Sequence, residues 1–99
     1  MEGLWHIVLF NFWPQASEAQ KAEVLRRLTT LGDDCGGKDA GILFWKAGKD
    51  IGLRKKTDLV EISVFRDEAA FEQFRAHPKH AELVSVVRDC ADWKVGDIR

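Results

Sequence analysis

Three histidines occur in the sequence, and two of them, His6 and His80, stand among apolar residues where an imidazole could act as an acid or a base. His6 is in phase with Val8 and Phe10 of a predicted strand, and burying its ring there costs about 1–3 kcal/mol that a valine would avoid. A buried imidazole that stays neutral near pH 7 is a candidate general base. We therefore predict that His6 and His80 form an acid–base pair that needs no metal ion and no cofactor.

A structural role is the alternative for both histidines. In that interpretation His80 satisfies backbone groups of a first helical turn, while His6 donates a hydrogen bond to His80 or to a carbonyl. His77 directly precedes Pro78, which disfavours helical backbone, so we assign His77 to a helix junction rather than to chemistry. A metal site on His77 and His80 would need a third ligand such as Glu72, and we predict no metal.

The first half of the chain predicts a strand, a helix and a second strand. The first strand covers Leu4 to Phe12, which is rich in β-branched and aromatic residues. The segment Ser17-Glu18-Ala19-Gln20 has the pattern of a capping box, so a helix is expected from there to about Leu31. Gly32 is expected to end that helix in a left-handed conformation. The second strand is predicted over Gly41 to Lys46.

The second half repeats this order less regularly. A third strand is predicted over Asp58 to Phe65, after a loop whose basic tip Arg54-Lys55-Lys56 is expected to be solvated. Asp67 is expected to cap a helix, and Pro78 to begin a second helical segment. A last short strand covers Trp93 to Ile98.

The order β-α-β-β-α-β is typical of a ferredoxin-like α+β fold, in which helices cover one face of an antiparallel sheet. The other face would expose an apolar patch too large for a monomer. We therefore predict a single domain over residues 1–99 that forms a homodimer through this open face, in the manner of a dimeric α+β barrel. The expected patch comprises Trp5, Ile7, Leu9, Ile42, Phe44 and Leu59.

The space between helices and sheet is expected to hold a small apolar pocket for an apolar or carbonyl-containing ligand. Its predicted walls are Val8, Phe10, Trp45, Val60 and Phe74.

Glu61 is expected on the opposite, dimer-facing side of the third strand, where Lys46 or Lys94 would pair with it. Two cysteines are too few for a disulfide framework, so we expect free thiols, with Cys90 buried and Cys35 more exposed.

Composition excludes several function classes. The chain has 99 residues, of which 45% are hydrophobic, and 15 basic against 16 acidic residues give a net charge of −1. Such a balance provides no field to hold a polyanion, so no nucleic-acid partner is expected. The longest apolar run is far shorter than the roughly 20 residues of a membrane span, and we expect a cytoplasmic protein without a membrane partner.

Three segments together resemble the stress-responsive A/B barrel (Dabb) domain family. They are Trp5-His6-Ile7-Val8-Leu9-Phe10-Asn11-Phe12, Phe65-Arg66-Asp67-Glu68-Ala69-Ala70-Phe71 and Ala76-His77-Pro78-Lys79-His80. The resemblance spans nearly the whole chain. It implies a dimeric α+β barrel, which agrees with the dimer expected from the apolar sheet face.

The resemblance also implies candidate chemistry, because the family includes a cofactor-free polyketide cyclase similar to olivetolic acid cyclase. Its aldol condensation uses a histidine, a tyrosine and a second histidine, at positions that fall on His6, Phe74 and His80. Phe74 lacks the hydroxyl, so the main hypothesis is a homodimeric, stress-responsive protein of uncharacterised activity that binds a small molecule. The alternative is a cofactor-free cyclase or lyase that uses His6 and His80. Cofactor-free monooxygenation would rest on fold analogy alone.

Overall fold

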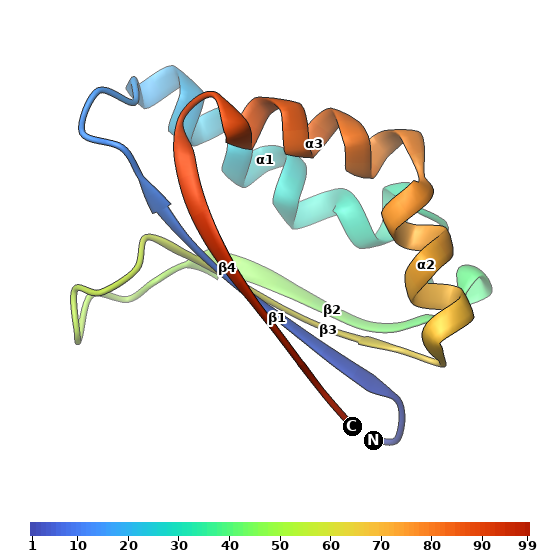
Figure 1. The fold of residues 1–99 in the computed structure, drawn as a ribbon. Coiled ribbons are helices and arrows are strands. Elements are labelled where there is room, and N and C mark those ends of the chain that lie inside the picture. Colours follow the sequence, from blue (N-terminus) through green and yellow to red (C-terminus); the bar gives the residue numbers. More distant parts are fainter.

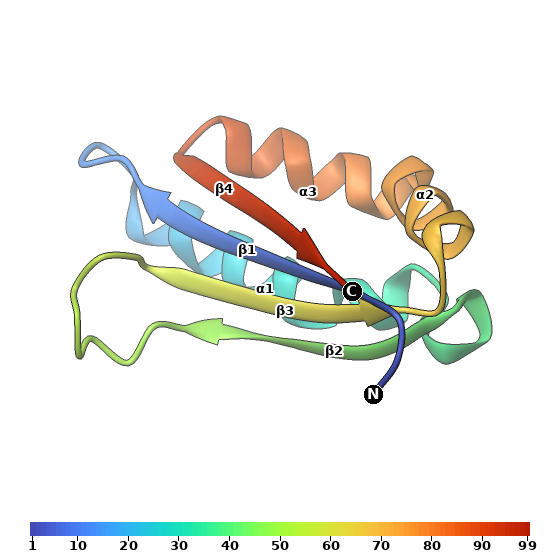
Figure 2. The ribbon, with the colours of Figure 1, turned by 60° about the horizontal axis from the view of Figure 1, so that its bottom comes forward.

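Four strands, of which β1 and β3 are rich in β-branched and aromatic residues, form an antiparallel sheet, and the three α-helices all cover one face of that sheet (Figures 1 and 2). The computed structural model describes residues 1–99. The spatial strand order is β2-β3-β1-β4, which confirms the predicted ferredoxin-like fold. The elements are β1 (Leu4–Phe12), α1 (Glu18–Asp34), the short 3-10 helix η1 (Gly37–Ala40), β2 (Ile42–Lys49), β3 (Leu59–Phe65), α2 (Glu68–Ala76), α3 (Pro78–Arg88) and β4 (Ala91–Ile98).

Local side-chain caps begin all three α-helices, as predicted. The Ser17 hydroxyl accepts from the Gln20 backbone N–H at 3.0 Å, and the Gln20 side chain accepts from the Ser17 N–H at 2.8 Å. The Asp67 carboxylate caps α2. The Nδ1 atom of His77 accepts from the Lys79 N–H at 3.0 Å, so His77 caps α3 and is occupied by that role.

The prediction that Gly32 ends the first helix is wrong. Helix α1 continues to Asp34, and the left-handed glycine is Gly36, with φ of 109°. Gly32 is a close-packing position instead, because an added Cβ would lie 2.7 Å from Cγ of Trp45. The Trp45 indole N–H donates to the carbonyl of Leu28 at 3.0 Å, which holds the ring against α1.

Gly32→Ala is expected to lower the free energy of unfolding by about 1–3 kcal/mol, because the new methyl group overpacks the contact with Trp45. Urea denaturation measures the change. Gly48→Ala on β2 is the control, since its Cβ would meet no atom within 4 Å. Equal effects of the two substitutions would contradict the close-packing role of Gly32.

Strand register decides which residues face the helices, and it reverses the prediction for the third strand. Val8 of β1 lies opposite Glu61 of β3 and Val95 of β4, so these side chains share the helix-facing side. Val60, which pairs with Leu9, therefore lies on the open face and not in the pocket. Both faces of β3 are apolar, so its sequence does not reveal which one is covered.

Two members of the predicted open-face patch, Leu59 and Ile42, are instead buried beneath the helices. Leu59 shares the side of Phe10, its partner on β1. Ile42 is paired with Phe65, and a bulge between Ile42 and Phe44 changes the face that β2 presents. The apolar residues of the open sheet face, as we name it below, are Trp5, Ile7, Leu9, Phe44, Val60, Ile62, Val64 and Ile98, and Lys46 and Lys94 lie on the same side of the sheet.

The open sheet face remains broadly apolar and lies opposite all of the helices (Figure 2). Leu9 is 39% exposed and Phe44 37% exposed on this face. No helix is both long enough and apolar enough to cross a membrane.

Candidate functional site

A cavity of about 780 Å³ lies between the sheet and the helices. Its walls are mostly apolar, and six of the residues predicted for the site line it: His6, Val8, Phe10, Trp45, Phe74 and His80. The exception is Val60, for the register reason given above.

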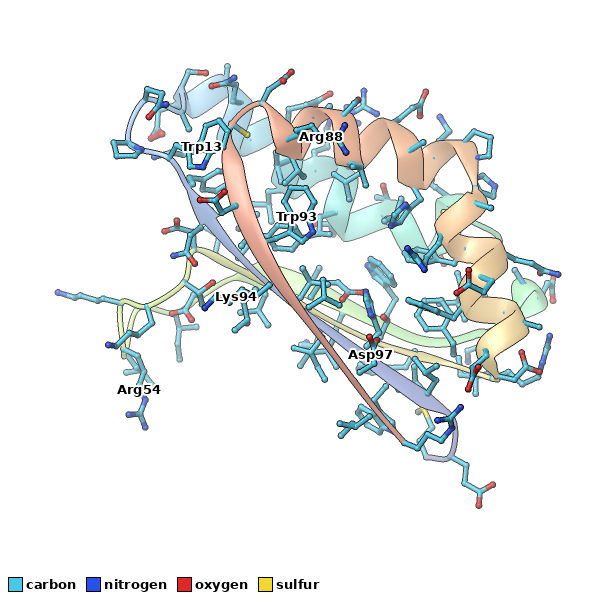
Figure 3. All side chains as sticks on the ribbon, in the orientation of Figure 1. Trp13, Arg54, Arg88, Trp93, Lys94 and Asp97 are labelled. Atoms are coloured by element: carbon cyan, nitrogen blue, oxygen red, sulfur yellow. The ribbon has the colours of Figure 1, made fainter.

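The cavity opens along the edge strand β4. Trp93, Val95 and Asp97 alternate along this strand and line the cavity, and Trp93 and Val95 are 38% and 51% exposed. Figure 3 shows Trp93 and Asp97 pointing toward the helices, whereas Lys94 points away from them. Because β4 has a neighbour only on its β1 side, these residues form an accessible rim.

His6 is paired with an acidic residue that the sequence analysis did not identify. Its Nδ1 atom lies 2.7 Å from Oδ1 of Asp97, and the two residues are direct cross-strand partners on β1 and β4. A carboxylate accepts the Nδ1–H proton, which leaves Nε2 of the neutral ring as the free acceptor. The pair thus fixes the orientation of a buried imidazole at the cavity wall.

His80 projects from α3 into the same cavity. Its ring packs edge-on against Phe74, with ring centroids 4.8 Å apart, and neither ring nitrogen is hydrogen-bonded to the protein. Burial lowers the pKa of His80, and the charge of Arg75 and that of His6 in its protonated form lower it further. The ring is therefore neutral at pH 7 and can accept a hydrogen bond or a proton from a molecule in the cavity.

Aromatic rings fill the space around the two histidines. His6 packs against Phe71, with centroids 5.0 Å apart, and Phe65 and Phe74 are in contact with 5.0 Å between centroids. Phe74 sits beside His80 without a hydroxyl group, so no phenol donates a hydrogen bond there.

Glu61 lies on the cavity side of β3, which corrects the prediction that it faces a dimer partner. It is 1% exposed, and neither carboxyl oxygen is hydrogen-bonded. Burial raises the pKa of Glu61 to about 8; the Ser63 hydroxyl opposes this rise, and the charge of Asp97 adds to it. The predicted pairing with Lys46 or Lys94 is wrong, because the register puts both lysines on the open side of the sheet.

Metal and thiol chemistry find no support in the site. No three His, Cys, Asp or Glu residues gather as a potential metal site. Cys35 is buried, contrary to the prediction, and burial followed by the charge of Asp34 raises the pKa of its thiol to about 11. The thiol is thus protonated at neutral pH and is a poor nucleophile.

Two acidic residues, Asp97 and Glu61, were missed as members of the site. The alternation of Trp93, Val95 and Asp97 is a weak signal that the three share a face. Only the register shows that this face meets His6. For Glu61 the signal is its place within an apolar strand.

An antiparallel sheet with all helices on one face and an apolar cavity beneath them defines a ferredoxin-like α+β protein. The chain belongs to the stress responsive A/B barrel domain family, whose model matches residues 4–98. A comparison with curated protein sequences finds no match.

Solved structures share this fold at low sequence identity. A dimeric ferredoxin-like protein of unknown function from Thermobifida fusca YX is 20% identical, with a TM-score of 0.83 over 99% of this chain and 92% of the other. The hydroxynitrile lyase of Passiflora edulis is 21% identical (TM-score 0.76, covering 96% and 90%). SnoaB, a cofactor-independent oxygenase from Streptomyces nogalater, is 17% identical (TM-score 0.72, covering 97% and 90%). The fold thus serves both enzymes and proteins of unknown function.

Proposed function

We propose that this protein is a cytoplasmic homodimer that binds a small, largely apolar molecule in the cavity between its helices and sheet. The observation that carries the proposal is the cavity itself, because its walls are apolar while a few polar groups, including His6 and His80, converge on it. Dimerisation through the open sheet face is supported by its exposed apolar side chains and by structural neighbours described as dimeric.

Native mass spectrometry after exposure of the protein to a metabolite extract tests the binding function. We expect a retained small molecule on the wild type. Val84→Trp should reduce its occupancy at least about tenfold, because Val84 lines the cavity and the larger indole would project into the space that a ligand uses. Ser85→Trp is the matched control, since Ser85 is exposed on the same helix. Equal occupancy in all three proteins, or none in any, would refute this binding site.

A cofactor-free acid–base enzyme is the second candidate, and the His6–Asp97 pair favours it. An imidazole oriented by a carboxylate, together with a neutral His80, provides two proton acceptors in one apolar cavity. His80 could remove a proton next to a substrate carbonyl while His6 binds or returns a proton. The hydroxynitrile lyase and the cofactor-independent oxygenase among the structural neighbours are consistent with such chemistry on this fold.

Histidine titration by nuclear magnetic resonance separates the two candidates. An acid–base pair should show coupled titration of His6 and His80, with His80 below the pKa it has in the urea-unfolded chain. If both rings are inert between about pH 5 and 8, the enzyme candidate loses its basis.

A further inference from the structure

Two polar side chains on the helix-facing side of β3, Glu61 and Ser63, have no partner in the protein beyond each other. Glu61 is 1% exposed and Ser63 is fully buried; the Ser63 hydroxyl lies near enough to Glu61 to oppose the rise in its pKa, but neither Glu61 oxygen nor that hydroxyl has hydrogen-bond geometry to any protein group. Buried polar groups in native proteins are nearly always hydrogen-bonded. Of the two residues only Glu61 lines the binding cavity, and an unsatisfied carboxyl group in that wall points to a partner that arrives with the ligand.

The strand register places Glu61 and Ser63 next to the His6–Asp97 pair. Ser63 lies directly opposite His6, whose other neighbour is Asp97, and Glu61 lies opposite Val8 in the adjacent row of the sheet. Glu61, His6 and Asp97 therefore form a polar patch on the sheet side of an otherwise mostly apolar cavity.

The protein itself offers no cation to Glu61. Arg75 is the only lysine or arginine that lines the cavity, and its guanidinium lies 3.4 Å from the carboxylate of Glu72. His6 is engaged by Asp97. A buried carboxyl group without a cation is most stable when it carries its proton, and in that form it is a hydrogen-bond donor.

We propose that Glu61 forms an oxygen-binding subsite, in which its carboxylic acid donates a hydrogen bond to a carbonyl oxygen of the ligand. The ligand class is therefore a neutral carbonyl compound with an apolar body. A carboxylate ligand is disfavoured by the charge of nearby Asp97. This subsite rests on the proposed binding function and specifies its ligand.

Three probes of similar shape test the subsite: hexylbenzene, hexanophenone and 1-phenylhexan-1-amine. Their binding is followed by the fluorescence of the cavity residues Trp45 and Trp93. At pH 6.5 the ketone should bind the wild type about tenfold more tightly than the hydrocarbon, which corresponds to one hydrogen bond made in a buried site. That preference should disappear by about pH 9.5, because the pKa of Glu61 is about 8 and a carboxylate cannot donate.

Two substitutions isolate Glu61 from the other titratable groups. Glu61→Gln keeps an N–H donor, so the ketone preference should persist at both pH values, whereas Glu61→Leu should show no preference at either. The wild type and the variants share the remaining ionisable groups of the cavity, which are His6, Glu72, Arg75, His80 and Asp97. Comparing the ketone preference of wild type and variant at the same pH therefore cancels the effect of these groups. If Glu61→Leu does not fold, the comparison of the wild type with Glu61→Gln at the two pH values still tests the subsite.

The outcomes distinguish the subsite from the binding function. Equal binding of ketone and hydrocarbon to the wild type would overturn the subsite and leave the binding function intact. Tightest binding of the amine would also overturn it, because Glu61 would then act as a carboxylate. If none of the probes binds, the binding function fails and the subsite fails with it.

Discussion

Glu61→Gln is expected to be more stable than the wild type at pH 9 by about 4 kcal/mol, and to differ little from it at pH 4.5. The folded protein holds the Glu61 proton up to a pKa of about 8, whereas the unfolded chain releases it near the ordinary glutamate pKa of 4.5. Between pH 4.5 and about 8 the native state therefore binds more protons than the unfolded chain. The contribution of the Glu61 proton to the free energy of unfolding is fully present below pH 4.5 and is lost as the pH rises toward 8.

Denaturant unfolding of both proteins from pH 4.5 to 9, at one fixed protein concentration, measures this difference. Other groups also titrate in the window, including His80, whose lowered pKa costs stability as pH falls. They contribute equally to both proteins, so the difference between the two curves reports Glu61. Glu2→Gln, at an exposed residue, is the control and should follow the wild type. Parallel curves for Glu61→Gln and wild type would show that Glu61 is ionised in the folded protein.

Ile7→Asp is expected to convert a dimer into a monomer, with the dissociation constant raised at least about hundredfold. Ile7 lies on the central strand β1, and its cross-strand partners on the open sheet face are Ile62 and Gly96, so no lysine stands directly opposite. A buried aspartate without a partner costs several kcal/mol at an interface, and every 1.4 kcal/mol is a tenfold change in affinity.

Sedimentation velocity at micromolar protein measures this change, and circular dichroism checks that the variant is folded. Ile51→Asp is the matched control, because Ile51 is 83% exposed in the β2–β3 hairpin, away from the sheet face. A wild type that sediments as a monomer, or an Ile7→Asp variant that stays dimeric, would show that the open sheet face is not the dimer interface.

Helix starts are predictable from this sequence because their determinants are local. The Ser17–Gln20 capping box and the Asp67 cap act within three residues, and both occur in the structure as predicted. Helix ends are less certain: the Gly32 error arises because a contact with Trp45 on another element also selects glycine.

Strand faces depend on register, which is a non-local property. The face of β3 that meets the helices is fixed by the pairing of Val8 with Glu61, and neither sequence segment alone contains that information. For the same reason Val60 was assigned to the pocket and Glu61 to the opposite face. The presence of His6 and His80 at one cavity was predictable because each belongs to a clear apolar pattern.

The His6–Asp97 pair shows what a sequence pattern cannot supply. The two residues are 91 positions apart and meet because β4 returns beside β1. Alternation places Asp97 on one face of its strand, but only the strand order brings that face to His6.

The position of the cavity rim on an edge strand separates ligand selection from folding. Trp93, Val95 and Asp97 line the entrance, yet they remain partly exposed, and surface substitutions usually change stability by less than about 0.5 kcal/mol. Residues 93 and 95 can therefore vary the size and polarity of the entrance while the buried strands keep the scaffold unchanged. A protein built this way can acquire a new ligand by substitutions in one short segment, without repacking its core.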